Sequence, residues 1–138
     1  MPQAREANVT EQAATIYKIL LPMKRKPGMS TQEFRDYYEN HHAPLAARYS
    51  AALLRYVRTY LEPHPHPETG AATEPPYDVI TELWFDDEAI YRSTLQYLTT
   101  TKMPPEIVED EMQLFDRSSF CISPRLSGKP TSMPCVRR

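Results

Sequence analysis

The residues best suited to proton transfer are two adjacent histidines, His41 and His42, just after the tyrosine pair Tyr37-Tyr38. A histidine in a pocket titrates near neutral pH, so it can both accept and donate a proton. Tyr38 precedes His42 by one helical turn, where two side chains can stack or hydrogen-bond. His42 is therefore the first candidate for a catalytic acid or base. Tyr38 would orient it or contact a substrate carbonyl. The alternative is that His42 only caps the helix and Tyr38 only packs.

His41 is a weaker catalytic candidate. On a helix it lies about 100° around from His42 and falls on the stripe of Phe34 and Tyr37. That position favours a histidine packed in the core, with a catalytic role as the alternative. Adjacent histidines also lack the spacing of a helical metal-binding pair.

Aromatic and charged residues on the neighbouring segments could form the walls of a site. A flat phenolic ligand favours aromatic walls with hydroxyl tips, and an acidic ligand needs a cation. Ordinary core packing and solvated strand charges would explain the same residues. An inward-facing acid on the strand near residue 80 could also orient His42, and Asp78 and Glu82 are the candidates there. The candidates for substrate contact are Tyr17, Lys18, Tyr56, Tyr60, Glu82 and Trp84, with Arg55 and Arg58 as further cations.

Several other functions have no support in the sequence. The net charge is −2 without a basic stripe, which argues against nucleic acid. No apolar run reaches the length of a membrane span. There is no phosphate loop, dinucleotide fingerprint or nucleophile elbow. His64 and His66 stand without a third ligand at metal spacing, and the acidic run at residues 106–111 is typical of a solvated helix face. We expect no metal, no cofactor, no nucleic acid and no membrane.

Cysteine usage and the N-terminus indicate the compartment. Cys121 and Cys135 are the two cysteines, and they are more typical of free thiols than of a disulfide framework. The first residues, MPQAREANVTEQAA, are polar and lack the apolar core of a signal peptide. We therefore expect a cytoplasmic protein.

The elements that would position the candidate residues alternate between strand and helix patterns. Strands are predicted at residues 15–23, 54–61, 77–85 and 118–123, and helices at about 30–42, 45–52, 87–98 and 104–115. Ser30 and Glu33 form a capping box at the start of the first helix. Pro44 disfavours helical geometry before it, so this helix should end near His42, where the macrodipole favours an imidazolium. Pro22 predicts that the first strand stops there or lies at an edge.

The order is β-α-β-β-α-β with an extra helix before the last strand, which predicts an α+β fold of the ferredoxin-like type with an antiparallel sheet. Helices on one face of such a sheet leave the other face bare and partly apolar. Packing against a second copy would cover it, so we expect a homodimer. The expected organisation is a flexible arm at 1–14, one domain at 15–124 and a tail at 125–138.

Three blocks of the sequence carry a family resemblance. They are the capped helix running into His42-Ala43-Pro44-Leu45, the segment ELWFDDEA at residues 82–89, and Asp110-Glu111 followed by Phe115-Asp116. Together they resemble the EthD-like family of dimeric α/β-barrel proteins over residues 15–124. The resemblance implies a dimer with its sheets face to face and a pocket between helices and sheet. Tyr38 stands where the family often has tryptophan, which would make the pocket more polar.

The resemblance leaves the reaction open. The proline-rich insert at residues 62–76 and the motif ELWFDD are similar to a fungal subgroup that acts on aromatic polyketide acids. This implies a cofactor-independent decarboxylase with His42 as acid and base. The alternatives are a dehydratase or cyclase on the same substrates, a cofactor-free quinone-forming monooxygenase, a haem-binding relative, and a non-catalytic protein that binds aromatic ligands. The insert itself is a candidate lid over the pocket.

Overall fold

A single antiparallel sheet underlies the part of the chain that this computed structural model describes, residues 15–125. Its strands are β1 (Tyr17–Arg25), β2 (Arg55–Tyr60), β3 (Val79–Phe85), β4 (Phe115–Asp116) and β5 (Ser123–Pro124). The order is β2-β3-β1-β4, and β5 also pairs with β1. All of these pairings are antiparallel. The predicted arm at 1–14, Cys135 and nearly all of the predicted tail lie outside the described residues.

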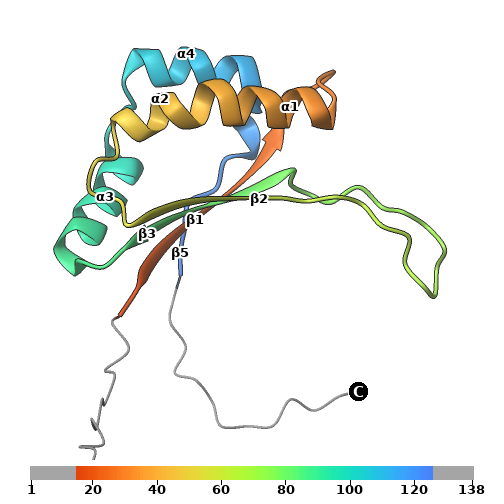
Figure 1. Cartoon of the computed structure of the whole chain (residues 1–138), viewed down its shortest axis with the longest axis horizontal. Coiled ribbons are helices and arrows are strands. Elements are labelled where there is room, and N and C mark those ends of the chain that lie inside the picture. Colours follow the sequence, from red (N-terminus) through yellow and green to blue (C-terminus); the bar gives the residue numbers. More distant parts are fainter. Residues whose placement is uncertain (1–14, 126–138) are drawn as a thin grey trace, which may run out of the picture.

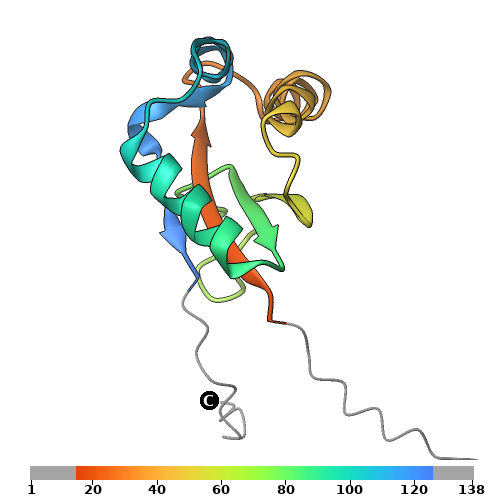
Figure 2. The ribbon, with the colours of Figure 1, turned by 90° about the vertical axis from the view of Figure 1, so that its left-hand side faces the viewer.

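The helices pack against one face of this sheet (Figures 1 and 2). They are α1 (Thr31–Tyr37), α2 (Ala43–Arg48), α3 (Glu88–Thr100) and α4 (Pro105–Leu114), and a π-helical turn, Tyr38–His42, joins α1 to α2. The order of strands and helices, with α4 as the additional helix, confirms the predicted α+β ferredoxin-like fold. In residues 15–125 no helix is long and apolar enough to cross a membrane.

The strands have two distinct faces because successive side chains of a strand point to opposite sides. We call the side that meets the helices the inner face and the other side the outer face. In β3 the inner residues are buried and the outer residues only half-buried. Register fixes which residues of the neighbouring strands join them: Ile19 of β1 and Tyr56 of β2 both lie opposite Leu83. The same register puts Tyr56, Arg58 and Tyr60 of β2 together on the inner face.

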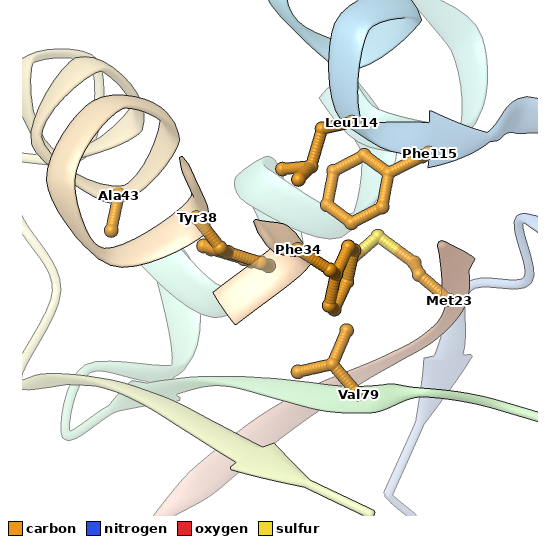
Figure 3. Close-up of a cluster of buried hydrophobic side chains, with 7 residues drawn as sticks. All are labelled: Met23, Phe34, Tyr38, Ala43, Val79, Leu114 and Phe115. Atoms are coloured by element: carbon orange, nitrogen blue, oxygen red, sulfur yellow. The ribbon is translucent and has the colours of Figure 1, made fainter. Parts of the chain in front are cut away.

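The core lies between the inner face and the helices. One cluster joins Met23 of β1 and Val79 of β3 to Phe34 of α1 and Phe115 of β4 (Figure 3). Tyr38 is also fully buried in this cluster, with its ring edge-on to Phe34 and Phe115. The aromatic packing holds the helical segment that carries His42 in place above the sheet.

A second cluster fastens α3 to the other end of the sheet. Its centre is Ile19, Leu83 and Phe85, and the predicted apolar stripe of α3 packs against it through Tyr91 and Leu95. Asp87 caps α3 by accepting a hydrogen bond from the Ile90 N–H.

The predicted start of α1 is confirmed, but its predicted end is wrong. Ser30 Oγ accepts from the Glu33 N–H and the Glu33 carboxylate accepts from the Ser30 N–H, which is a complete capping box. The helical path then continues past Pro44 as α2 instead of ending near His42. His42 therefore lies inside a helical segment, and the expected stabilisation of an imidazolium by a helix C-terminus does not apply.

The π-helical turn explains how the helix passes a proline. Pro44 has no N–H, and in an α-helix its ring would clash with the carbonyl of Asn40. Here the preceding N–H, of Ala43, reaches back five residues to the Tyr38 carbonyl, which widens the turn. A wider turn contains more residues than an α-helical turn. His42 therefore takes the inward position that follows Phe34 and Tyr38, which α-helical spacing gives to His41. Turns of this type often occur at functional sites.

The last predicted strand, at residues 118–123, is wrong in detail. Two short pairings, β4 and β5, flank a 3₁₀ turn at Arg117–Ser119. The Asp116 carboxylate accepts from the Ser118 N–H, and Ser119 Oγ accepts from the Lys24 N–H of β1. These local side-chain bonds replace the ladder bonds of a continuous strand.

The prediction that Pro22 ends β1 is also wrong, because β1 continues to Arg25. The backbone groups of Lys18 and Lys24 bond on the side of β4 and β5. The backbone of Pro22 faces the same side, because it lies an even number of residues from both lysines. It falls between the residues that pair with β5 and those that pair with β4, so its missing N–H costs no hydrogen bond of the sheet.

The proline-rich segment at residues 62–76 forms a long excursion that extends away from the helices (Figure 1). An isolated bridge, Pro65 to Ala72, closes its tip. Arg25 of β1 anchors its returning arm through Glu74 and Asp78. This position is not that of a lid over the helical side of the sheet.

Candidate active site

A cavity of about 590 Å³ lies between the inner face of the sheet and helices α2, α3 and α4. Its walls are mostly aromatic and aliphatic. Its polar groups include His42 and Tyr56 on one part of the wall and Glu111 and Arg117 on another. A mainly apolar cavity with a few polar groups and shifted pKa values is the usual form of a small-molecule site.

His42 is held from behind by a carboxylate. Its Nδ1 lies 2.8 Å from Oδ2 of Asp110 on α4, and Tyr37 donates its O–H to Oδ1 of the same carboxylate at 2.6 Å. The side chains of His42 and Asp110 are only 7% and 16% exposed. Edge-on contacts with Tyr38 and Phe115 fix the plane of the imidazole. Tyr37, Asp110 and His42 therefore form one hydrogen-bonded row.

This environment sets the protonation of His42. Burial lowers the pKa of His42 below its ordinary 6.5, and the hydrogen bond and charge of Asp110 partly oppose that shift. A neutral ring that faces a carboxylate carries its proton on Nδ1, since a carboxylate only accepts. The other nitrogen, Nε2, then has a free lone pair. That is the state of a general base oriented by an acid, as in catalytic triads.

Nε2 is the nitrogen available to a ligand. Every buried polar side-chain atom of residues 15–125 has a hydrogen-bond partner. Within the same residues, the hydrogen bond of the His42 ring is made by Nδ1 and none is made by Nε2, so Nε2 keeps accessible surface. His42 is one of the residues that line the cavity.

A row of hydroxyl groups reaches the cavity from the sheet. The Tyr38 hydroxyl lies 2.7 Å from Thr81 Oγ1 and 2.9 Å from the Tyr56 hydroxyl, and Tyr56 lines the cavity. Burial raises the pKa of Tyr38 well above 10 and also raises the pKa of Tyr56. Both phenols therefore stay protonated, and Tyr56 is placed to donate to a carbonyl or enolate oxygen.

A carboxylate and a guanidinium complete the polar part of the wall. Glu111 of α4 is 12% exposed, and its Oε2 lies 3.4 Å from Nε of Arg117, which is 42% exposed. Burial raises the pKa of Glu111 above its ordinary 4.5, the neighbouring Asp110 adds to the rise, and Arg117 opposes it. The cavity thus contains a histidine with a lowered pKa and a carboxyl group with a raised one.

The structure brings three of the predicted site residues to the cavity: His42, Tyr38 and Tyr56. His41 is exposed and stacks on Tyr37 at 4.9 Å, so the expectation of a core histidine is wrong. Tyr60 is on the inner face but outside the cavity wall, where its hydroxyl donates to Glu39.

Tyr17 lies at the far end of the sheet. Its ring stacks on Tyr91 at 5.3 Å, and its hydroxyl faces Glu88. It does not line the cavity wall.

Lys18, Glu82 and Trp84 lie on the outer face, with the sheet between them and the cavity. Lys18 pairs with Trp84 across β1 and β3, and its Nζ lies 3.8 Å from the centre of the indole ring. Glu82 accepts from the indole N–H of Trp84 at 3.4 Å. The Cζ of Arg55 lies 5.4 Å from the centre of the Trp84 ring. These residues form an outer-face cluster.

The acids expected near His42 are placed elsewhere. Glu82 is in the outer-face cluster, and Asp78 binds the Arg25 guanidinium and N–H. Arg58, one of the candidate cations, is on the inner face but is held by Glu39 at 2.6 and 3.0 Å. The cation that does line the cavity is Arg117.

The sequence analysis did not identify Asp110 and Glu111 as site residues. An acidic run such as residues 106–111 is typical of a solvated helix face, and this pattern hides the two carboxylates that point inward. The buried residues of α4 are Ile107 and Leu114. The residues that we expect to form its apolar stripe are Val108, Met112 and Phe115; of these Phe115 is buried, and it lies just after the helix. Glu111 falls between Ile107 and Leu114 at helical spacing, so a stripe drawn through these two residues would have placed it inward. The one feature of the sequence that indicated a role for Asp110 is its place in the third block of the family resemblance.

The described residues contain no cluster of side chains that could bind a metal ion. Within residues 15–125 no three side chains of histidine, cysteine, aspartate or glutamate come together as metal ligands. His64 and His66 lie exposed on the proline-rich excursion, and the thiol of Cys121 is exposed and free.

Comparison with known proteins points to one family. The family model for the EthD domain matches residues 26–118, which is more than half of the chain. An ethyl tert-butyl ether D (EthD) family protein from Bacillus halodurans C-125 matches in structure with a TM-score of 0.52 and 18% identity, over 83% of this chain and 100% of that one. An EthD-like protein from Ralstonia eutropha JMP134 matches with a TM-score of 0.50 and 15% identity, over 86% and 95%. At these identities the two structures support the fold alone. No curated protein matches the sequence.

Proposed function

The chain belongs to the EthD domain family, and from that premise we propose that it is a cofactor-independent decarboxylase of an aromatic or pre-aromatic polyketide carboxylic acid, with His42 as acid and base. The observation that carries the proposal is His42 itself. Asp110 holds its Nδ1 at 2.8 Å, and the ring lines an apolar cavity with its other nitrogen accessible. An imidazole oriented by a carboxylate and left with an accessible nitrogen is the arrangement of a general base.

The chemistry follows from the groups present. A substrate with a carbonyl β to its carboxyl group has its own electron sink. Neutral His42 accepts the carboxylic acid proton on Nε2. The carbon–carbon bond then breaks, CO₂ leaves, and the electron pair becomes an enolate whose oxygen accepts a hydrogen bond from Tyr56. The imidazolium returns the proton to carbon, so the carboxyl group is replaced by hydrogen and His42 is neutral again.

The surroundings of His42 fit each of these steps. A lowered pKa keeps the resting imidazole neutral, and Asp110 stabilises the imidazolium that forms in mid-reaction. Tyr56 stays protonated, so it is a donor throughout. An apolar cavity also favours loss of CO₂, because a carboxylate is less stable there than the dispersed charge of an enolate.

The proposed substrate class rests on the walls of the cavity and on the sequence. Its volume of about 590 Å³ is within the usual range for sites that bind drug-sized molecules. Tyr38, Tyr56, Phe115 and Phe120 contribute aromatic rings. The insert at residues 62–76 and the motif ELWFDD are the features similar to the polyketide-associated subgroup.

We also propose that the protein is a homodimer. Leu20, Val57, Ile80 and Trp84 lie on the outer face, which no helix of the described residues covers, and each is only half-buried. A second copy would bury them. Sedimentation of the wild-type protein beside Ile80→Glu tests this: the proposal predicts a dimer that the substitution dissociates.

Mass-resolved turnover of a panel of aromatic β-keto and ortho-hydroxy acids, without added metal or cofactor, tests the reaction. Loss of the mass of CO₂ is the predicted result. Loss of the mass of water would replace the proposal by a dehydratase, and gain of oxygen would replace it by a monooxygenase. Tight binding without any turnover would favour a ligand-binding protein.

A further inference from the structure

Glu111 has no part in the reaction described above, yet the fold presents it to the same cavity as His42. It occupies a turn of α4 between two buried residues, Ile107 and Leu114, which turns its side chain inward. Only 12% of that side chain is exposed, and Arg117 contacts it at 3.4 Å. A carboxyl group buried in an apolar wall with one long contact to a half-exposed cation is unusual unless it has a use.

The charges around Glu111 come from several elements. Asp110 precedes it on α4, Arg117 faces it from the 3₁₀ turn, and Tyr56 of β2 is close enough to feel its charge. His42 of the π-helical turn lines the same cavity. Burial and Asp110 favour the protonated form of Glu111, and Arg117 is the one cation among these neighbours that favours the charged form.

We propose that Glu111 is a second catalytic residue, a carboxylic acid that donates a proton to the substrate's carbonyl oxygen while His42 transfers the proton at carbon. This deepens the proposed function and rests on it. As CO₂ leaves, the electron pair of the broken bond forms the carbon–carbon double bond of an enol, and the carbonyl oxygen takes the Glu111 proton. His42 then protonates carbon, and the Glu111 carboxylate takes back the enol proton. Both residues end in their starting states.

Protonation of the oxygen replaces a charged enolate by a neutral enol. The negative charge then rests on the Glu111 carboxylate, which faces the Arg117 guanidinium at 3.4 Å, and not on an enolate that only Tyr56 would stabilise by a hydrogen bond. Arg117 is then a positioning residue: its charge opposes the protonation of Glu111 and sets the pH at which the acid is available.

The same pair of residues should also interconvert a ketone and its enol without decarboxylation. β-Tetralone, an aromatic ketone with exchangeable hydrogens beside its carbonyl, is the probe. Its hydrogen–deuterium exchange in D₂O, followed by mass spectrometry, needs a base at carbon and an acid at oxygen. We expect the wild-type protein to accelerate exchange, and Glu111→Gln to reduce the rate by about 10²-fold, as is typical of removing a general acid. Glu109→Gln, an exposed substitution on the same helix, is the matched control and should leave the rate unchanged.

The pH profile separates catalysis from structure. The active form has neutral His42 and protonated Glu111, so exchange should fall at low pH as His42 gains a proton and at high pH as Glu111 loses one. Glu111→Gln should remove the high-pH limb. Arg117→Gln should move that limb to higher pH, because it removes the cation that opposes protonation. A merely structural Glu111 would leave the limb in place in both variants.

The outcomes distinguish this inference from the proposed function. Decarboxylation of a keto acid by the wild type, with exchange that is absent or independent of Glu111, would overturn the inference and leave the proposed function intact. Exchange that depends on Glu111, without decarboxylation of any acid in the panel, would support the acid–base pair and overturn the proposed reaction. Absence of both activities would overturn both.

Discussion

Asp110 and His42 are 68 positions apart in the sequence, yet a 2.8 Å hydrogen bond joins them at the wall of the cavity. The bond links α4 to the π-helical turn, and both partners are largely buried. It orients the imidazole and decides which ring nitrogen carries the proton. The proposed activity depends on this relationship more than on any other.

Asp110→Asn should lower the pKa of His42 further, because the carboxylate is what opposes the effect of burial. The ring then stays neutral to lower pH, and the low-pH limb of kcat/KM should move in the same direction. The rate itself should fall on the order of 10²-fold, since the developing imidazolium loses its counter-charge. NMR titration of the His42 ring checks the pKa. A pKa that rises or stays unchanged would contradict this account of the site.

Pro44→Ala should reduce activity by allowing the wide turn to close. The new N–H can bond to the Asn40 carbonyl and removes the clash, so the π-helical turn can tighten to an α-helix. His42 would then turn away from Asp110. We expect at least a ~10-fold loss of turnover, since small misplacements of catalytic groups are costly. Full activity in this variant would show that the wide turn does not position His42.

Tyr38→Phe should destabilise the fold by about 1–3 kcal/mol, because it leaves the buried Thr81 hydroxyl without its 2.7 Å partner. Urea unfolding measures the change. Tyr17→Phe is the matched control: it removes a 3.5 Å contact to exposed Glu88 and should cost less than about 0.5 kcal/mol. Equal effects of the two substitutions would mean that the buried hydroxyl row does not stabilise the protein.

Shortening the proline-rich excursion should hardly affect catalysis. Replacing residues 66–71 by Asn-Gly keeps the bridge between Pro65 and Ala72 and supplies a two-residue hairpin turn. None of residues 62–76 lines the cavity, so kcat/KM should change by less than about twofold. A larger loss would restore the idea that this segment is a lid.

Much of the architecture followed from local patterns. The capping box of Ser30 and Glu33 and the strands predicted at residues 54–61 and 77–85 are each specified by residues close together in the sequence, and the structure confirms them as the start of α1, β2 and β3. The last strand failed because Asp116 and Ser119 satisfy backbone groups locally, a choice that depends on the neighbouring Lys24.

The site was harder to predict because it depends on register and on tertiary contacts. Because of the π-helical turn, His42 points inward and His41 outward, the reverse of what α-helical spacing predicts. That spacing alone does not reveal such a turn. Period-two alternation places Glu82 and Trp84 on a common face of β3, but it does not say which face of the strand meets the helices. Glu111 shows the opposite case, since its spacing from Ile107 already indicated an inward position.

The most direct test of the central claim compares two adjacent residues. CO₂ release from the acid that the wild-type protein turns over should be measured for His42→Ala and for His41→Ala, with circular dichroism to confirm that both variants fold. The account predicts a loss of about 10²- to 10⁴-fold for His42→Ala, as for removal of a general acid–base group. It predicts nearly unchanged release for His41→Ala, whose ring lies exposed on Tyr37. Unchanged release from His42→Ala, or an equal loss in both variants, would contradict a catalytic His42.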